Sequence, residues 1–181
     1  MDILLRNIKL DDLDDFFKLN HPDMAHHNFD GPYFAKETLE ELQQRVDAIK
    51  ANLISGKSDT FVDKRHAIAD ANTDKLVGMV NWYWKSEETN WLEVGVVVFD
   101  DNYWGRGIAS KALKKWIDII FEQHPKIVRI GLTTWSGNIG MVKVAEKLGL
   151  AQEACFKNAR IVDGKYYDSV SYGILRQDWN F

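Results

Sequence analysis

Hydrophobic positions in the first third of the chain predict one strand followed by two helices. The stretch DILLRNI, residues 2–8, has the apolar character of a short strand. Residues 10–20 carry Leu13 and Phe16 at helical spacing. Residues 36–55 form a longer helical pattern that Gly56 ends. The apolar residues of this second helix recur three and four positions apart, at Leu39, Leu42, Val46, Ile49 and Leu53.

The middle of the chain is rich in strand patterns. Three of them follow one another, at residues 65–70, 75–86 and 91–99. The sequences ANTD and EETN between them are typical of turns, so we expect antiparallel hairpins. A helix with an apolar face then runs from Ile108 to Phe121.

The last third of the chain contains strand and helix patterns in turn. A strand pattern at 127–135 precedes a helix at 138–148, which Gly149 ends. Strand patterns at 150–161 and 166–175 flank the sequence VDGK, a hairpin signal. The complete order predicts an α+β protein with a mixed, mostly antiparallel sheet covered by helices, and we expect residues 1–181 to form a single domain.

Composition narrows the classes of function. The 181 residues are 45% hydrophobic, enough for a substantial core, and the net charge of −4 argues against nucleic acid as a main partner. Cys155 is the only cysteine, which excludes an intramolecular disulfide and a cysteine-rich metal site. No apolar run reaches membrane-spanning length, and the acidic first residues are unlike a signal peptide. We therefore expect a cytoplasmic protein without a membrane partner.

Two glycines stand where the strand VGVVVF leads into the helix at Ile108. Backbone N–H groups at a helix start lack intrahelical partners and carry the positive end of the dipole. Gly105 and Gly107 would let a phosphate group reach them, and Arg106 would add charge. A tight turn without a ligand is the alternative. The chain has no GxxxxGK[ST] motif, and it has two of the three glycines of a dinucleotide-binding turn.

The stretch NYWGRGIASKAL resembles the acetyl-CoA motif of the GNAT N-acetyltransferase superfamily, [RQ]-x-x-G-x-[GA]. Trp104 stands where Arg or Gln is usual, Gly107 is the central glycine, and Ala109 closes the motif. The sequence YWGRG resembles the branch that acetylates N-terminal amines of ribosomal proteins and polyamines. The blocks TTWSGNIGMVKVAEKLGL and ARIVDGKYYDSVSYGILRQDW follow in the order of that superfamily, so the resemblance covers nearly the whole chain.

The resemblance implies an α/β/α-layered fold with splayed central strands, helices on both faces and acetyl-CoA as co-substrate, without a metal. It implies that pantetheine lies along Val96, Val97 and Val98. It also implies that the pyrophosphate lies on the main chain of Trp104, Gly105, Arg106, Gly107, Ile108 and Ala109. Asn138 takes the position of a cofactor-contacting residue, and a plain helix cap is the alternative role.

Acetyl transfer to an amine needs one group that accepts the amine proton and another that donates a proton to the departing thiolate. Glu93 lies in an apolar strand at the family's usual base position; a solvated glutamate is the alternative, and it could also act through water. The family's usual acid, a tyrosine on the helix that Asn138 begins, is replaced by Ala145. Tyr166, Tyr167 or water could take that role.

Three further groups have weaker patterns. The histidines at 21, 26 and 27 suit neither helical nor strand geometry for a metal, so we expect a solvated loop. The tryptophans at 82, 84, 91 and 135 suit the core or an amine pocket, and Asp168 could help to recognise a cation. Cys155 could form an acetyl-enzyme, but a lone cysteine in a strand is more often a small hydrophobic residue.

These observations predict an acetyl-CoA-dependent N-acetyltransferase that acts on a primary amine by direct transfer in a ternary complex. The amine could belong to a protein N-terminus, a polyamine or another small molecule. A non-catalytic acyl-CoA-binding or sensing domain is the main alternative, and a nucleotide-binding oxidoreductase is the third. A homodimer is left open.

Overall fold

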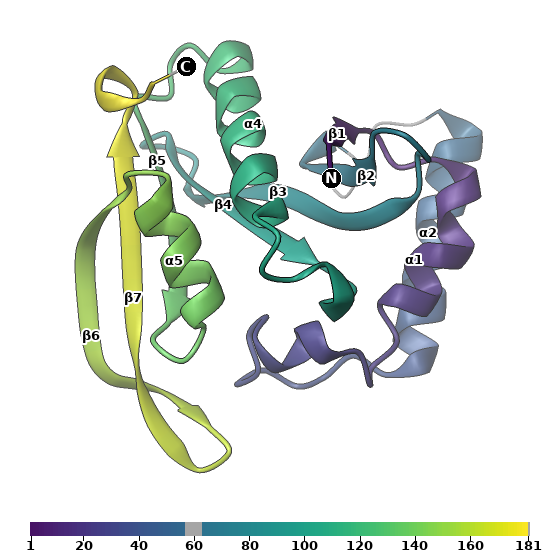
Figure 1. Ribbon diagram of the computed structural model, residues 1–181, viewed down its shortest axis with the longest axis horizontal. Helices are drawn as coiled ribbons and strands as arrows, with labels where there is room; N and C mark the ends of the chain where they lie inside the picture. The colour runs from purple at the N-terminus through teal and green to yellow at the C-terminus, as the bar shows by residue number, and fades with distance from the viewer. Residues whose placement is uncertain (57–62, 181) are drawn as a thin grey trace. The chain divides into compact units, whose positions relative to one another are not determined.

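The computed structural model describes residues 1–56 and 63–180 (Figure 1). In this part of the chain a seven-stranded sheet has the order β1-β2-β3-β4-β5-β7-β6. The pairs β1–β2, β2–β3, β5–β7 and β6–β7 are antiparallel, and β4–β5 is parallel. The predicted α+β architecture with a mixed, mostly antiparallel sheet is confirmed.

The chain divides into two compact units, which we describe separately. The N-terminal unit comprises Met1–Asn81 and Val96–Ile108, and the C-terminal unit comprises Trp82–Gly95 and Ala109–Phe181. The long strands β3 (Leu76–Ser86) and β4 (Trp91–Val98) contribute one half to each unit. That the whole chain behaves as a single domain stays a prediction.

The N-terminal unit packs two helices on a short antiparallel sheet. Its complete elements are β1 (Ile3–Arg6), α1 (Leu13–Leu19), α2 (Leu39–Ser55) and β2 (Arg65–Asp70). Short 3₁₀ turns lie at η1 (Leu10–Asp12), η2 (Ala25–Asn28) and η3 (Asp101–Tyr103). The core joins side chains of both helices to the strands, and its members are Ile8, Leu13, Phe16, Leu42, Val46, Ile49, Ala67, Leu76, Met79 and Phe99.

The helix α2 begins three residues later than its sequence pattern predicted. Thr38 is the N-cap: its hydroxyl accepts from the N–H of Glu41 over 3.2 Å, and the Glu41 carboxylate accepts from the N–H of Thr38 over 2.7 Å. This reciprocal pair satisfies backbone donors that the helix leaves open, so Lys36 and Glu37 stay outside. Gly56 ends the helix with φ of 63°, as predicted.

The C-terminal unit contains α4 (Ile108–Gln123), apart from its first residue, and α5 (Ile139–Lys147). Its further strands are β5 (Arg129–Trp135), β6 (Ala151–Val162) and β7 (Lys165–Leu175), followed by η4 (Arg176–Asp178). In Figure 1 both helices lie on the viewer's side of these strands. Buried apolar side chains of β5 and β7, such as Ile130, Leu132 and Tyr172, belong to one face.

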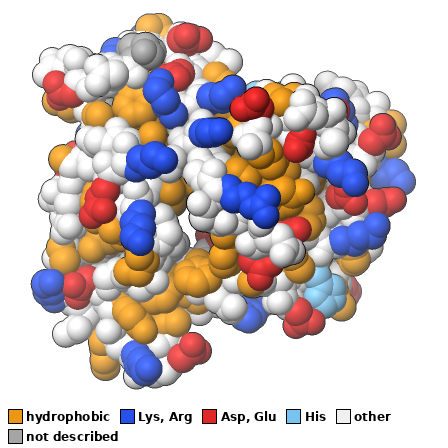
Figure 2. Space-filling model, viewed as in Figure 1, with side chains coloured by type: hydrophobic (Ala, Val, Ile, Leu, Met, Phe, Trp, Pro, Cys, Tyr) orange, Lys and Arg blue, Asp and Glu red, His pale blue; other side chains and the backbone are white. Residues whose placement is uncertain are grey.

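The strands β6 and β7 form the predicted hairpin. Asp163 and Gly164 have φ of 50° and 74°, as a tight two-residue turn requires. Exposed apolar side chains gather on the β6–β7 end of this unit (Figure 2), and Phe156, Ile161 and Tyr166 are among the exposed residues. None of the described helices combines the length and apolar character that a bilayer crossing requires.

Candidate active site

The turn that leads into α4 is built on two glycines in the left-handed region. Gly105 has φ of 71° and Gly107 has φ of 75°. A side chain at such angles costs roughly 1–2 kcal/mol, so the backbone conformation by itself explains the choice of glycine. A Cβ added to Gly105 would meet no atom within 4 Å. The space beside this turn is therefore open to a ligand.

Trp104, at the start of the motif, packs within the N-terminal unit. Its ring meets Phe29 edge to face, with 5.5 Å between the ring centroids. Its indole N–H donates to the carbonyl oxygen of Val98 over 2.9 Å. The Arg106 guanidinium lies 5.7 Å from the centroid of the Tyr103 ring. Trp104 thus ties the glycine turn to the last residue of β4.

The end of β4 is fixed on β3 by close backbone contact. The N–H of Phe99 donates to the carbonyl of Val77 over 3.0 Å. A Cβ on Gly78 would overlap the carbonyl oxygen of Val97, so the two strands approach this closely because Gly78 has no side chain. Val96 and Val97 stay partly exposed, whereas Val98 is buried. Val96–Val98 and the glycine turn therefore form one continuous segment of the N-terminal unit.

Asn138 is the N-cap of α5 in the C-terminal unit. Its Oδ1 accepts from the N–H of Met141 over 3.0 Å, which is the cap that the sequence left as an alternative role. The helix carries Ala145, fully buried, and its sequence IGMVKVAEK contains no tyrosine. The hydroxyl group usual in the family is therefore absent from α5.

Glu93 is a buried carboxylate in the middle of β4. Its exposed fraction is 2%. The Tyr83 hydroxyl donates to Glu93 Oε2 over 2.6 Å, and the Thr133 hydroxyl donates to Oε1 over 2.9 Å. Burial excludes the alternative of a solvated glutamate. The two hydroxyl partners supply hydrogen bonds that the buried carboxyl group cannot obtain from solvent.

The pairing register shows which side chains share a face with Glu93. Glu93 pairs with Gly131, so the odd-numbered residues of β5 lie on its face. Thr133 pairs with Ser171, and their hydroxyl oxygens are 2.9 Å apart. The even-numbered residues Ile130 and Leu132 lie on the opposite face. Glu93 thus belongs to a row of polar groups that runs across β3, β4, β5 and β7.

The same alternation separates the two tyrosines predicted as acids. Tyr167 is half-buried on the face of Ser169 and Ser171, and its ring lies edge to face on Trp135, with 4.8 Å between centroids. Tyr166 lies on the opposite face of β7 and is 64% exposed. Of the two, Tyr167 shares the face of Glu93.

Tyr83, Thr133 and Ser171 were missed by the sequence analysis. The contacts of Tyr83 and Thr133 with Glu93 depend on the register between neighbouring strands, which the sequence pattern alone does not define.

Asp168 forms an ion pair with Lys157. Its Oδ2 accepts from Lys157 Nζ over 2.8 Å, and its Oδ1 accepts from the N–H of Asn158 over 3.1 Å. The bond from Lys157, aided by that from Asn158, lowers the pKa of Asp168. The thiol of Cys155 lies 3.5 Å from the same carboxylate and is exposed, so it is no buried hydrophobic residue. It is exposed because β6 stands at the edge of the sheet.

The predicted solvated histidine loop is wrong for His26. This side chain is 4% exposed, its Nε2 lies 2.9 Å from the carbonyl oxygen of Leu19, and its ring centroid is 5.4 Å from that of Phe99. Burial lowers the pKa of His26. Among the described residues, no cluster of three or more His, Cys, Asp or Glu could hold a metal ion.

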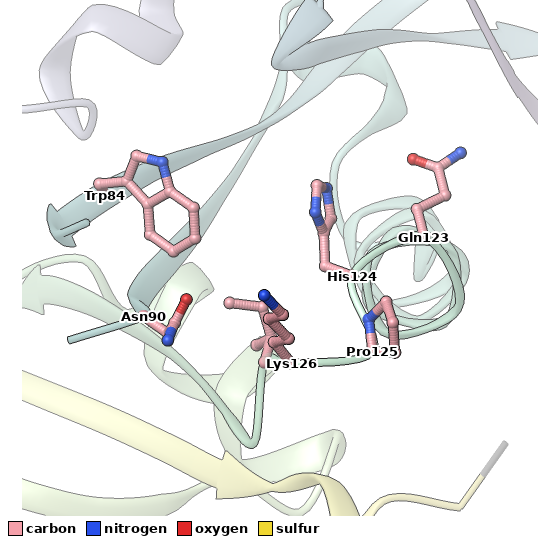
Figure 3. A pocket seen from close by; sticks show the side chains of 7 residues that line it. Trp84, Asn90, Gln123, His124, Pro125 and Lys126 are labelled. Atoms are coloured by element: carbon pink, nitrogen blue, oxygen red, sulfur yellow. The ribbon is translucent and has the colours of Figure 1, made fainter. Parts of the chain in front are cut away.

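A pocket of about 220 Å³ lies at the end of α4 in the C-terminal unit, lined by Trp84, Asn90, Gln123, His124, Pro125, Lys126 and Ile127. Figure 3 shows Trp84 and Asn90 across from His124, with Lys126 between them. Because side chains alternate along β3, Trp82 and Trp84 lie on the face opposite to Tyr83. This pocket is therefore not on the face of Glu93.

The geometry can be compared with known proteins. Residues 2–151 match the family described as Acetyltransferase (GNAT) domain. The chain is 32% identical over 108 residues to the uncharacterized N-acetyltransferase YnaD of Bacillus subtilis, which covers 59% of this chain and 61% of that relative. The chain thus spans less than two thirds of this curated relative.

Solved structures resemble the whole chain. The spermidine N-acetyltransferase from Vibrio cholerae, in complex with CoA and spermine, has a TM-score of 0.73 at 19% identity and covers 97% of this chain and 96% of its own. RimL, the ribosomal L7/L12 α-N-protein acetyltransferase in complex with CoA, has a TM-score of 0.72 at 19% identity and covers 96% and 93%. These similarities show the fold.

Proposed function

The chain belongs to the GNAT acetyltransferase family, and from this premise we propose that it transfers the acetyl group of acetyl-CoA to a primary amine. We infer direct transfer, with both substrates bound together. The structural neighbours named for spermidine and for ribosomal L7/L12 make a polyamine and a protein N-terminus the first amines to consider.

The observation that carries this proposal is the buried Glu93 carboxylate. An amine that attacks a thioester must lose a proton, and an anionic carboxylate in an apolar strand is a suitable acceptor. Charged groups are rarely buried without a role or a partner, and here the partners are neutral hydroxyls rather than a cation. Glu93 therefore forms no ion pair with either of these two partners.

We propose that acetyl-CoA binds to the end of β4 and to the glycine turn that follows it. Val96, Val97 and Val98 would offer backbone groups to the pantetheine amides, and the turn from Trp104 to Ala109 would offer backbone N–H groups to the pyrophosphate. The Trp104 side chain acts by packing, as its bond to Val98 supports. Asn138 would contact the cofactor in addition to capping α5.

For protonation of the thiolate we propose Tyr167 rather than Tyr166, because Tyr167 shares the face of Glu93. A water molecule is the alternative donor. The second candidate function, a non-catalytic acyl-CoA-binding or sensing domain, is favoured by one observation, the buried Ala145 where the family has its tyrosine.

One assay separates the two functions. The protein is mixed with acetyl-CoA and, in turn, spermidine or a short peptide with a free N-terminal alanine. Thiol release is followed together with the mass of the amine. We expect one acetyl group on the amine for each thiol released. If acetyl-CoA raises the melting temperature by binding the folded state but no amine is acetylated, the chain is a sensing domain.

A further inference from the structure

The carboxylate of Glu93 is enclosed, yet one of its two partners reaches solvent. Glu93 is 2% exposed, whereas Tyr83, which donates to its Oε2 over 2.6 Å, is 40% exposed. Tyr83 therefore joins solvent-accessible surface to a carboxyl group that has almost none. Its hydroxyl group, which can both accept and donate a proton, is bonded directly to that carboxyl group.

The second partner of Glu93 is held differently. The Thr133 hydroxyl donates to Oε1 over 2.9 Å, and its oxygen lies 2.9 Å from Ser171 Oγ. With its proton directed to Glu93, this oxygen accepts from Ser171. Thr133 is thus fixed by groups of the sheet itself, and its part is to orient the carboxylate.

We propose that Tyr83 is a catalytic residue that passes the amine proton to Glu93. The proposal rests on the acetyltransferase function proposed above and adds a residue to it. The proton would move along the short 2.6 Å hydrogen bond between the Tyr83 hydroxyl and Glu93 Oε2. The solvent-exposed part of the Tyr83 side chain would let the amine approach.

The step balances without any further reactant. The amine nitrogen bonds to the thioester carbonyl carbon, the C–S bond breaks, and the thiolate leaves with the electron pair. The N–H bond breaks as its proton goes to the Tyr83 oxygen. The original Tyr83 proton goes to Glu93 Oε2, so the phenol ends unchanged and Glu93 ends protonated. Glu93 then returns its proton through the same phenol to solvent.

The main test compares Tyr83→Phe with Thr133→Val. Each variant removes one hydroxyl from the same carboxylate, so each leaves one Glu93 oxygen without its partner. Single-turnover acetyl transfer is measured with saturating acetyl-CoA, on whichever of spermidine and the alanine peptide the wild-type protein acetylates. We expect Tyr83→Phe to lower the rate about 100-fold and Thr133→Val to lower it less than tenfold. Equal losses would overturn the relay.

A proton inventory distinguishes a relay from a purely structural role. In mixtures of H₂O and D₂O, transfer of two protons in one step gives a curved dependence of rate on deuterium content, and transfer of one gives a straight line. We expect a curve for wild type and for Thr133→Val, and a straight line for Tyr83→Phe. A straight line for wild type would overturn the proposal, and this measurement needs no variant.

The last comparison uses the Glu93→Gln protein as its background. If Tyr83 acts only by passing the proton to Glu93, Tyr83→Phe should change the rate less than threefold when Glu93→Gln is already present. A further 100-fold loss in that background would contradict the relay. Failure of the proposed function looks different, because wild-type protein would then acetylate neither amine.

Discussion

The ring of Tyr167 lies edge to face on the ring of Trp135, with 4.8 Å between their centroids. Gly137 permits this arrangement, because a Cβ at that position would overlap the tryptophan ring. Trp135 is almost completely buried, so it gives the phenol of Tyr167 a fixed support on the face of Glu93. Tyr166 has no such position, since it lies on the opposite face of β7.

This difference predicts unequal effects of two matched substitutions. Tyr167→Phe keeps the aromatic contact and removes the proton donor, so the rate of thiol release should fall about tenfold or more. Tyr166→Phe, its neighbour and control, should stay within twofold of wild type. Full turnover by both variants would assign the protonation of the thiolate to water.

The glycine turn allows backbone strain to be separated from ligand approach. Asn tolerates positive φ better than most residues, so Gly105→Asn should unfold near the wild-type temperature. Its side chain would occupy the open space beside the turn, so we expect the Kd for acetyl-CoA to rise about tenfold or more, as measured by calorimetry. Gly105→Val should also raise the Kd. In addition, its backbone strain should lower the free energy of unfolding by roughly 1–2 kcal/mol.

Gly149 provides the control for this experiment. It has φ of 76° at the end of α5, and a Cβ there also meets no atom within 4 Å. Gly149→Asn therefore imposes the same backbone demand and should leave the Kd for acetyl-CoA unchanged. Equal affinities of the two Asn variants would show that no phosphate approaches Gly105.

The buried ring of His26 predicts a pH-dependent stability. Burial lowers its pKa in the folded protein, an effect that the bond to the Leu19 carbonyl only partly opposes. Above the unfolded value of about 6.5 the ring is neutral in both states, and its contribution is fully present. Below it, the unfolded chain binds a proton that the folded protein does not yet bind. The free energy of unfolding should therefore fall as the pH decreases from about 7 to 5.

His26→Gln isolates this contribution, because it removes the titrating ring and retains a donor for the Leu19 carbonyl. Urea denaturation at several pH values should show a shallower decline for the variant than for wild type. His66, whose pKa burial also lowers, remains in both proteins and so does not affect the comparison. Parallel curves for the two proteins would exclude His26 as the source.

The sequence patterns predicted the elements well where local chemistry decides them. Gly56 and the Asp163-Gly164 turn end their elements as expected, because glycine adopts positive φ without steric cost. The apolar neighbours of Glu93 indicated burial but left a solvated glutamate as an alternative, which the structure excludes. The start of α2 differed because the cap at Thr38 is a side-chain bond that periodicity does not reveal.

Contacts between distant segments were the part that the sequence could not give. The bond from Thr133 to Glu93 depends on the register of β4 on β5, which two paired positions define. The pairing of Asp168 with Lys157 depends on a register shift in β6 between Phe156 and Arg160. His26 is buried because η2 places its ring beside Phe99, seventy-three positions away in the sequence.

Glu93→Gln tests whether Glu93 accepts the amine proton during acetyl transfer. Glutamine keeps the size of the side chain and removes the base. We expect the single-turnover rate of acetyl transfer to fall about 100-fold or more, while the Kd for acetyl-CoA stays unchanged. Glu88→Gln, at an exposed glutamate in the turn of the same hairpin, should keep the wild-type rate. A Glu93→Gln protein that transfers acetyl groups as fast as Glu88→Gln, with the same pH dependence, would show that Glu93 is not the proton acceptor.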